Sequence, residues 1–226
     1  MFITRAIQNH HFDVAWQFSD GLARVSIGDY STGKWGFIDK TGTYVINPQF
    51  DDADSFSDGL AAVRIGDRET GKWGFIDKTG SVVINPQFDD TDSFSEGLAV
   101  VRIGDDETGK WGFIDKTGSV VINPQFDDAY PFSEGLASVE IGDEWGFIDK
   151  TGSVVINPQF DLNLPFSDGL AAVLIGDIRT GKWGFIDKTG SFVINPQFDS
   201  ALAFSDGLAL VRIGDDTTDK WGFIAR

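Results

Sequence analysis

The chain has 226 residues, of which 41% are hydrophobic and 23% are charged, and it contains no cysteine. This composition is typical of a folded globular protein, and it excludes disulfide bonds and thiolate metal sites. The formal net charge of −17 disfavours nucleic acids and anionic membranes as partners, because their phosphate groups would be repelled. The same charge favours solubility and suits basic partners or cations.

The amino-terminal sequence, MFITRAIQNHHFD, has no long apolar run and no small-residue cleavage site, so we expect no secretory signal. No later stretch approaches the roughly 20 consecutive apolar residues of a membrane span. We therefore expect a cytoplasmic monomer that neither crosses nor binds a membrane. No pattern in the sequence calls for a cofactor, and none is expected.

A period of about 38 residues dominates the chain. The dipeptide Trp-Gly occurs six times, in steps of 38, 38, 34, 38 and 38 residues. Residues 34–71 and 72–109 differ at six of 38 positions. The six tryptophans, which we expect to be structural, are Trp35, Trp73, Trp111, Trp145, Trp183 and Trp221. A repeat of this length predicts a solenoid or a propeller, in one domain that spans residues 1–226.

The chain begins with half of a repeat. Residues 4–12 align with residues 42–50 of the following copy, so residues 2–12 are predicted to form a strand. The carboxyl end stops after Trp221-Gly222-Phe223-Ile224, before the corresponding strand of the last copy. We predict that residues 2–12 complete that last repeat.

Each full repeat reads as three antiparallel strands, which the second copy illustrates. Residues 59–67 form the first strand, residues 72–78 the second and residues 81–86 the third, with Pro86 as its end. Thr79-Gly80 predicts a tight hairpin with Gly80 in a left-handed conformation. A crossover rich in Asp and Ser follows, and it has room for a short fourth strand.

One repeat is shorter than the others. Between Gly135 and Trp145 the chain lacks four residues that the other copies have between their Ile-Gly-Asp and Trp-Gly motifs. A segment that loses residues while both flanks stay intact is predicted to be an exposed loop.

The pattern of apolar residues predicts sheets that are buried on both faces. Ala61, Val63 and Ile65 share one face, whereas Leu60 and Ala62 lie on the other. A sheet that is apolar on both faces must lie between two neighbours, as the blades of a propeller do. We therefore expect an all-β, six-bladed β-propeller, closed where residues 2–12 pair with the last half repeat. An open β-solenoid is the alternative, although its terminal units would need polar caps.

The repeat, K-W-G-F-I-D-K-T-G-x-x-V-I-N-P-Q-F-D with its Gly-Leu-Ala segment, resembles the bacterial WG (KWG) repeat family over nearly the whole chain. The resemblance implies a β-rich scaffold, commonly supposed to be propeller-like, and it implies no activity. Two departures are the four-residue deletion before Trp145 and the first half unit, which lacks Ile-Asn-Pro.

Residues suited to catalysis are scarce. Histidine occurs only at His10 and His11, which we interpret as surface residues of the first strand. The crossover of residues 51–58 has calcium-binding residue types but not the order of an EF-hand loop, so we interpret it as a solvated connection. A glycosidase would need two acids in different environments, and equivalent repeats offer no such pair. Cation binding by the crossovers is left open.

Three residues are candidates for binding. Trp16 stands in a crossover where the next copy has Asp54, so it breaks the symmetry and could cover the junction of the ring or touch a partner. Ser57 and Asp58 are the polar candidates in the second crossover. The tryptophans of the Trp-Gly motifs could bind sugars or methylated cations, but a large ring beside Gly is better suited to packing between blades.

The sequence therefore predicts a scaffold without enzymatic activity, which binds a protein through the loops at one face of the ring. A lectin-like or small-ligand binder with up to six equivalent sites is the first alternative. An enzyme that acts on glycans through carboxylates is the second.

Overall fold

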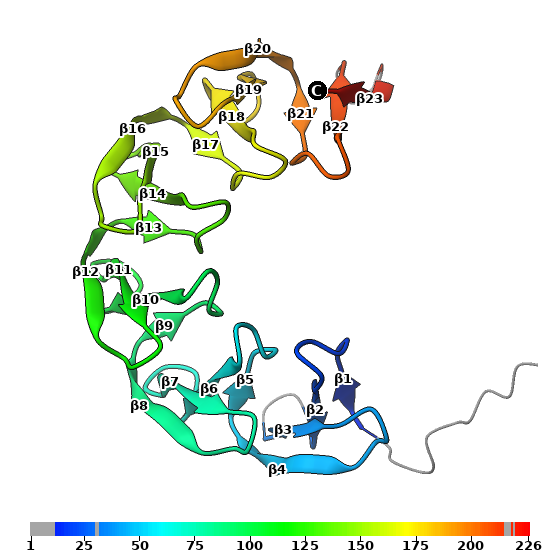
Figure 1. Ribbon diagram of the computed structural model, residues 1–226, viewed down its shortest axis with the longest axis vertical. Coiled ribbons are helices and arrows are strands. Elements are labelled where there is room, and N and C mark those ends of the chain that lie inside the picture. The colour runs from blue at the N-terminus through cyan, green and yellow to red at the C-terminus, as the bar shows by residue number, and fades with distance from the viewer. Residues whose placement is uncertain (1–11, 30–31, 215–217, 219) are drawn as a thin grey trace, which may run out of the picture. The chain divides into compact units, whose positions relative to one another are not determined.

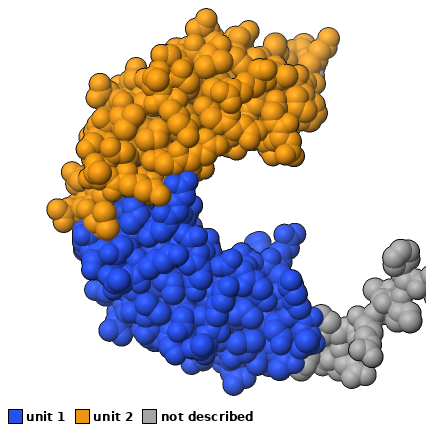
Figure 2. Space-filling view, viewed as in Figure 1, with its two compact units in different colours: residues 1–109, 113–120 blue, residues 110–112, 121–226 orange. Residues whose placement is uncertain are grey.

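A computed structural model describes residues 12–29, 32–214, 218 and 220–226. In these ranges the protein is all-β, with 23 strands and no helix. By its internal contacts the chain divides into two compact units, residues 1–109 with 113–120 and residues 110–112 with 121–226, shown blue and orange in Figure 2. Each unit is described by itself.

The strands form six antiparallel sheets, one after another along the chain (Figure 1). Sheet 1 has β1 (Val14–Ala15), β2 (Ala23–Ile27), β3 (Lys34–Ile38) and β4 (Tyr44–Phe50), and sheet 2 has β5 (Asp52–Ala53), β6 (Leu60–Ile65), β7 (Lys72–Asp77) and β8 (Val82–Phe88). Sheet 3 has β9 (Asp90–Thr91), β10 (Leu98–Ile103), β11 (Lys110–Asp115) and β12 (Val120–Phe126). The division between the two units falls in and around β11 and β12.

The second unit contains the remaining sheets. Sheet 4 has β13 (Asp128–Ala129), β14 (Ala137–Ile141), β15 (Glu144–Ile148) and β16 (Val154–Phe160). Sheet 5 has β17 (Leu162–Asn163), β18 (Ala171–Ile175), β19 (Lys182–Ile186) and β20 (Phe192–Phe198). Sheet 6 has β21 (Ser200–Ala201), β22 (Leu208–Ile213) and β23 (Lys220–Ala225), and in the described ranges it has no fourth strand. The predicted strand of residues 2–12 lies outside the described residues, except for Phe12.

Each crossover contributes the short strand for which the sequence left room. In sheet 2, Asp52 of β5 pairs with Arg64 of β6, and Ala53 pairs with Val63. The shortened repeat behaves as its sequence predicts, because β14 and β15 are joined directly through Gly142 and Asp143 in an exposed turn.

The predicted end of the third long strand at Pro86 is wrong, because β8 continues to Phe88. Pro86 is tolerated because β8 is the edge strand of its sheet and the β7–β8 register shifts between Trp73 and Phe75. The shift brings the backbone of β8 against Gly74. A Cβ on Gly74 would lie 2.5 Å from the Ile84 oxygen and 2.6 Å from the Pro86 nitrogen. The glycine of the Trp-Gly motif is therefore required by the close approach of two backbones.

In sheets 1 to 5, an aspartate organises the hairpin between the last two strands. In sheet 2, one oxygen of Asp77 accepts hydrogen bonds from the backbone N–H groups of Thr79 and Ser81 and from the Thr79 hydroxyl, at 2.8, 3.0 and 2.6 Å. These bonds, that from the Thr79 hydroxyl first, lower the pKa of Asp77. Gly80 has φ = +85°, as the sequence predicts.

Within each unit, neighbouring sheets pack face to face through their apolar faces. Between sheets 1 and 2, Phe37 meets Phe56 edge-on, with ring centroids 4.8 Å apart. Around this pair, Leu22 and Ile46 of sheet 1 pack with Ala61 of sheet 2 in one buried cluster. The same edge-on contact recurs in the pairs Phe75–Phe94, Phe147–Phe166 and Phe185–Phe204. One phenylalanine pair at each of these junctions therefore marks where one sheet covers the next.

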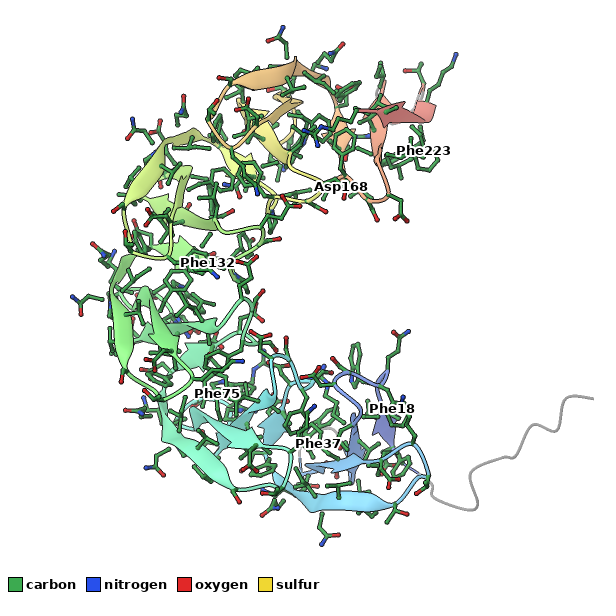
Figure 3. The ribbon with its side chains drawn as sticks, viewed as in Figure 1. Phe18, Phe37, Phe75, Phe132, Asp168 and Phe223 are labelled. Atoms are coloured by element: carbon green, nitrogen blue, oxygen red, sulfur yellow. The ribbon has the colours of Figure 1, made fainter. Side chains whose placement is uncertain are left out.

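Two members of this phenylalanine series are exposed, one in each unit (Figure 3). Phe18 stands at the position of Phe56, which is fully buried, yet it is 42% exposed. Phe223 stands at the position of Phe185, which is also fully buried, yet it is 70% exposed. Trp221 and Leu208, on the same face of sheet 6 as Phe223, are 53% and 45% exposed. Sheet 6 therefore presents to solvent the apolar face that sheets 1, 2, 4 and 5 bury against the next sheet.

We predict that Gly74→Ala lowers the free energy of unfolding by about 3 kcal/mol, because the methyl group would overlap backbone atoms that cannot move without breaking the β7–β8 pairing. Chemical denaturation followed by tryptophan fluorescence measures the change. Val83→Ala, at a position 42% exposed on the neighbouring strand, is the control and should be nearly neutral. Equal effects of the two substitutions would contradict the role assigned to Gly74.

Candidate functional site

Two of the candidate binding residues have partners that recur at equivalent positions of other junctions. The Ser57 hydroxyl donates to the Phe94 carbonyl at 2.7 Å, and the Asp58 carboxylate accepts from the Gly97 N–H at 2.8 Å. Ser19 and Asp20 make the same two bonds one repeat earlier. Asp58 also adopts a positive φ of 54°, like its counterparts in the other repeats. The geometry gives Ser57 and Asp58 a role in joining successive sheets.

The tryptophans of the Trp-Gly motifs differ in exposure. Trp145 is buried, Trp35, Trp73, Trp111 and Trp183 are partly buried, and Trp221 is 53% exposed. Trp35 and Trp73 pack against the buried clusters between sheets. The other candidate, Trp16, is 55% exposed and lies just after the short strand β1.

One row of side chains differs between the repeats, and no motif in the sequence singles it out. Each sheet contributes two residues to this row, which pair with each other across its first two strands, next to the tryptophan of the Trp-Gly motif. In sheet 1 these two strands are β1 and β2. The pairs are Val14–Ser26, Asp52–Arg64, Asp90–Arg102, Asp128–Glu140, Leu162–Leu174 and Ser200–Arg212. We call this the variable row. The row can be recognised in the sequence because it varies between repeats that are otherwise nearly identical.

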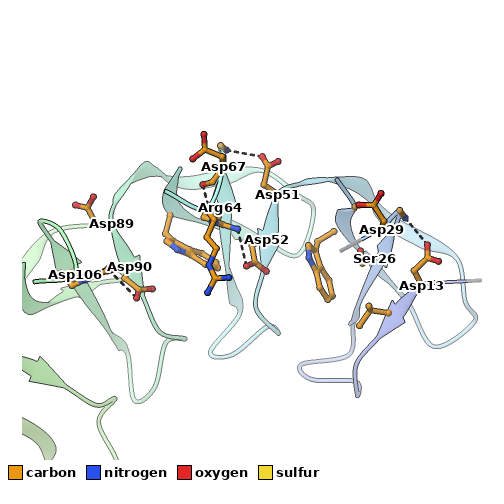
Figure 4. A pocket seen from close by; sticks show the side chains of 18 residues that line it. Asp13, Ser26, Asp29, Asp51, Asp52, Arg64, Asp67, Asp89, Asp90 and Asp106 are labelled. Carbon is orange, nitrogen blue, oxygen red and sulfur yellow. Dashed lines mark hydrogen bonds and ion pairs between the residues drawn. The ribbon is translucent and has the colours of Figure 1, made fainter. Parts of the chain in front are cut away.

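In the first unit the variable row lines a cavity of about 930 Å³ (Figure 4). Its walls come from sheets 1, 2 and 3, and they contain eight aspartates, three arginines and two tryptophans. The aspartates are Asp13, Asp29, Asp51, Asp52, Asp67, Asp89, Asp90 and Asp106. A cavity with such walls has an excess of negative charge and two aromatic surfaces.

Two of the three arginines of the cavity are held by carboxylates, and one of these two also lies over an aromatic ring. Arg64 lies 3.4 Å from an oxygen of Asp52, donates to the Asp67 carbonyl at 3.1 Å, and lies 5.8 Å from the centre of the Trp73 ring. Arg102 forms the corresponding ion pair with Asp90 at 3.7 Å and a further one with Asp106, which stands at the position of Arg68, at 2.6 Å. Arg64 and Arg102 are thus fixed parts of the wall, and they leave the cavity acidic.

Protonation of the carboxylates depends on their place in the wall. Burial opposes ionisation of Asp51, but hydrogen bonds from Lys34 and from the Gly66 N–H outweigh it, so its pKa is lowered. For Asp90, burial dominates over the hydrogen bond from Thr91 and the charge of Arg102, and the pKa is raised. The opposite pKa shifts follow from the balance between burial and the hydrogen-bond donors that each carboxylate meets.

Sheet 1 contains a second arrangement of an arginine between aromatic rings. The Arg24 guanidinium lies 4.6 Å from the centre of the Trp16 ring and 5.3 Å from that of the Trp35 ring. It also forms an ion pair with Asp54 of sheet 2 at 2.9 Å and donates to the Ala53 carbonyl. Burial raises the pKa of Asp54, and the charge of Arg24 opposes this. Trp16 is therefore part of an intramolecular cation–π site.

Sheet 4 carries acids where the first unit has basic residues. Asp128 lies directly opposite Glu140, so two like charges face each other across the strands. Glu144 precedes Trp145 where the other Trp-Gly motifs are preceded by lysine. Burial, followed by the charges of Asp128, Asp127 and Asp143, raises the pKa of Glu140.

His10 and His11 lie outside the described residues. Within the described ranges, no group of three or more histidine, cysteine or acidic residues is arranged to hold a metal ion. No helix that could cross a membrane occurs in the part of the chain that the structure describes.

The family of the chain follows from its repeats. The model of the WG containing repeat matches residues 9–30, 35–68, 73–105, 111–145, 145–177 and 183–221, and the chain belongs to this family. No curated protein sequence matches the chain.

Two solved structures share the fold at low sequence identity. A structure from a study of two prolyl endopeptidases is 10% identical, with a TM-score of 0.59, over 94% of this chain and 41% of the other. An acylaminoacyl peptidase of Pyrococcus horikoshii is also 10% identical, with a TM-score of 0.53, over 91% of this chain and 43% of the other. The chain thus spans less than half the length of these peptidases, and the likeness shows the fold alone.

We predict that Glu140→Gln raises the free energy of unfolding by about 0.5 kcal/mol at neutral pH, because it removes one of two like charges that face each other. A raised pKa means that the folded protein disfavours the ionised carboxylate, so the gain should vanish as the pH falls below the usual value of 4.5. Urea denaturation at several pH values measures both effects, and Glu107→Gln in an exposed turn is the control. A gain that is independent of pH would contradict this explanation.

Proposed function

We propose that the protein is a closed six-bladed propeller that works as a binding scaffold without enzymatic activity, and that its partner is a basic polypeptide. The acidic cavity of the first unit carries the proposal. It is large enough for several side chains, and its carboxylates outnumber its arginines by eight to three. Aromatic walls at Trp35 and Trp73 suit the stems and charged groups of lysine and arginine.

Closure of the ring is supported by the two exposed phenylalanines. Within the described ranges, Phe223 has no counterpart of the partner that Phe185 has in Phe204, and Phe18 has none of the partner that Phe56 has in Phe37. Contact of Phe223 with Phe18 would complete both. The apolar face of sheet 6, with Trp221 exposed, would then be covered by sheet 1. Residues 2–12 would supply the fourth strand of sheet 6, as the alignment of the half repeats predicts.

Glycine 222 gives a sharp test of this closure. A Cβ on Gly222 meets nothing within 4 Å, whereas a Cβ on the equivalent Gly184 lies 2.7 Å from the Ile194 oxygen of the fourth strand. If residues 2–12 pair with β23, Gly222→Ala should destabilise the protein about as much as Gly184→Ala, by about 3 kcal/mol.

Thermal and urea denaturation of the two variants give the comparison. A neutral Gly222→Ala beside a destabilising Gly184→Ala would contradict pairing of β23 with a further strand. In a chain that lacks residues 2–12, Gly222→Ala should have no effect, which serves as the matched control.

The differences between repeats favour a polypeptide over six equivalent sugar sites. The variable row is acidic and basic in sheets 2 and 3, purely acidic in sheet 4 and apolar in sheet 5. A lectin with six equivalent sites would need the same row in each repeat. An extended polypeptide, by contrast, can meet a different row at each step.

The binding function is tested with a fluorescent ten-residue peptide of alternating glycine and arginine. We expect binding that weakens as salt increases, and at least about a tenfold loss when Asp52 and Asp90 are both replaced by asparagine. A peptide of alternating glycine and glutamate should not bind. Equal binding of the two peptides, or of neither, would contradict the proposal, provided that circular dichroism shows the variant to be folded.

A further inference from the structure

Sheets 1 and 4 use equivalent positions in different ways, and the comparison points to a ligand. In sheet 1, Arg24 places its guanidinium within 4.6 and 5.3 Å of the ring centres of Trp16 and Trp35. The sequence alignment puts Tyr130 at the position of Trp16, Trp145 at that of Trp35 and Ser138 at that of Arg24. Sheet 4 therefore has an aromatic ring at both positions, as sheet 1 does, but a serine where sheet 1 has its arginine.

In sheet 4, which has no arginine at this position, the two aromatic rings stack on each other. The Tyr130 and Trp145 rings are stacked, with centroids 5.1 Å apart and planes at 18°. Trp145 is buried, but Tyr130 is 41% exposed, so one face of the stack is open to solvent. The Tyr130 N–H donates to the Ser138 carbonyl, and Asp128 and Glu140 form the neighbouring strand pair on the same face, so both carboxylates lie beside the exposed ring. Burial, followed by the charges of Asp128 and Glu140, raises the pKa of the Tyr130 hydroxyl.

Buried polar groups without partners lie in the same layer. Ser138 is 2% exposed, and among the described residues its hydroxyl has no hydrogen-bond partner. It shares a face of β14 with Glu140, because the two residues are separated by one position. An unpaired hydroxyl in this position is costly unless a ligand supplies the missing bond.

A second buried polar side chain, Asn163, lies in sheet 5, which packs on this face of sheet 4. Asn163 is 5% exposed, and neither its amide oxygen nor its amide nitrogen has a partner in the described part of the chain. Asn163 pairs with Val173, which packs in one cluster with Trp145 and Phe147 of sheet 4. The side chain of Asn163 therefore points into the layer between sheets 4 and 5. The corresponding residue of sheet 2 is Ala53, whose carbonyl accepts a hydrogen bond from Arg24.

We propose that this layer, formed by Tyr130, Ser138, Glu140, Trp145 and Asn163, binds the guanidinium group of an arginine side chain from the basic polypeptide partner. The proposal rests on the scaffold function and names one contact of its ligand. The external guanidinium takes the place of Arg24 in sheet 1, over the ring of Tyr130. Asp128 and Glu140 neutralise its charge, and the Ser138 hydroxyl and the Asn163 amide oxygen accept its N–H groups.

A guanidinium suits this set better than a metal ion or an ammonium group. Its planar shape stacks on an aromatic ring, and its five N–H donors can serve several separated acceptors. The acids here are not arranged as a set of metal ligands within the described residues. An ammonium group would match the charge but not the stacking surface.

The test compares short peptides that differ in one side chain. The probes are blocked tripeptides with arginine, lysine or citrulline between two glycines, where citrulline is a neutral isostere of arginine. Binding is followed by isothermal titration and by the tryptophan fluorescence that a change in the Tyr130–Trp145 stack would alter. We expect the arginine probe to bind most tightly and the citrulline probe at least about tenfold more weakly.

Two variants supply the missing cation from the protein itself. Ser138→Arg restores the arginine of sheet 1, and Glu140→Arg restores that of sheets 2 and 3. Each should fill the site and abolish binding of the arginine probe, while the fold is retained. Glu140→Gln should weaken binding by about tenfold through loss of one charge. Glu107→Gln, in the exposed turn of sheet 3, is the control and should leave binding unchanged.

The outcomes separate this inference from the scaffold function. If the ten-residue arginine peptide binds the protein but the arginine probe is unaffected by Ser138→Arg and Glu140→Arg, the site in sheet 4 is contradicted and the scaffold function stands. If citrulline binds as well as arginine, a guanidinium site is contradicted. If neither the long peptide nor the arginine probe binds, both proposals fail together.

Discussion

The structure depends on the need to cover both faces of every sheet. Strands such as β6 place Leu60 and Ala62 on one side and Ala61 and Val63 on the other, and all four are buried. Water must be excluded from both sides, so each sheet requires a neighbour on each side. Edge-on pairs such as Phe37–Phe56 lock adjacent sheets together. The same requirement makes an uncovered face, such as that of sheet 6, the natural place for a further contact.

This constraint separates the residues that fold the chain from those that vary. The glycine of the Trp-Gly motif allows two backbones to approach closely. The aspartate of the hairpin accepts the hydrogen bonds of the turn, and the phenylalanine pair fills the core between sheets. The variable row lies beside them and takes no part in the backbone approach at the glycine or in the hairpin bonds, although two of its members, Ser26 and Leu174, are buried. Its charge can therefore differ from one sheet to the next. The acidic cavity of the first unit and the acidic pair of sheet 4 are two results of this freedom.

Much of the fold could be predicted because its signals are local. The repeat period predicts the position of each Trp-Gly strand, and the Thr79-Gly80 sequence predicts a hairpin with Gly80 in a left-handed conformation. Pro86 was misjudged, since its tolerance depends on an edge position and a register shift that only pairing with β7 reveals. The candidate site was found only in part. Asp52 and Arg64 lie 12 residues apart and face each other only because of the strand register. A pattern of adjacent residues does not reveal such a pair.

We propose that the six sheets close into a ring, and a distance measurement tests this closure most directly. The chain has no cysteine, so spin labels can be placed by substitution at the equivalent, exposed positions Ile27, Ile65 and Ile213. Pulsed electron paramagnetic resonance on the pair 27 and 65 calibrates the step between two adjacent sheets. The account predicts that the pair 27 and 213 gives the same distance distribution. A clearly longer or much broader distribution for the second pair would contradict closure.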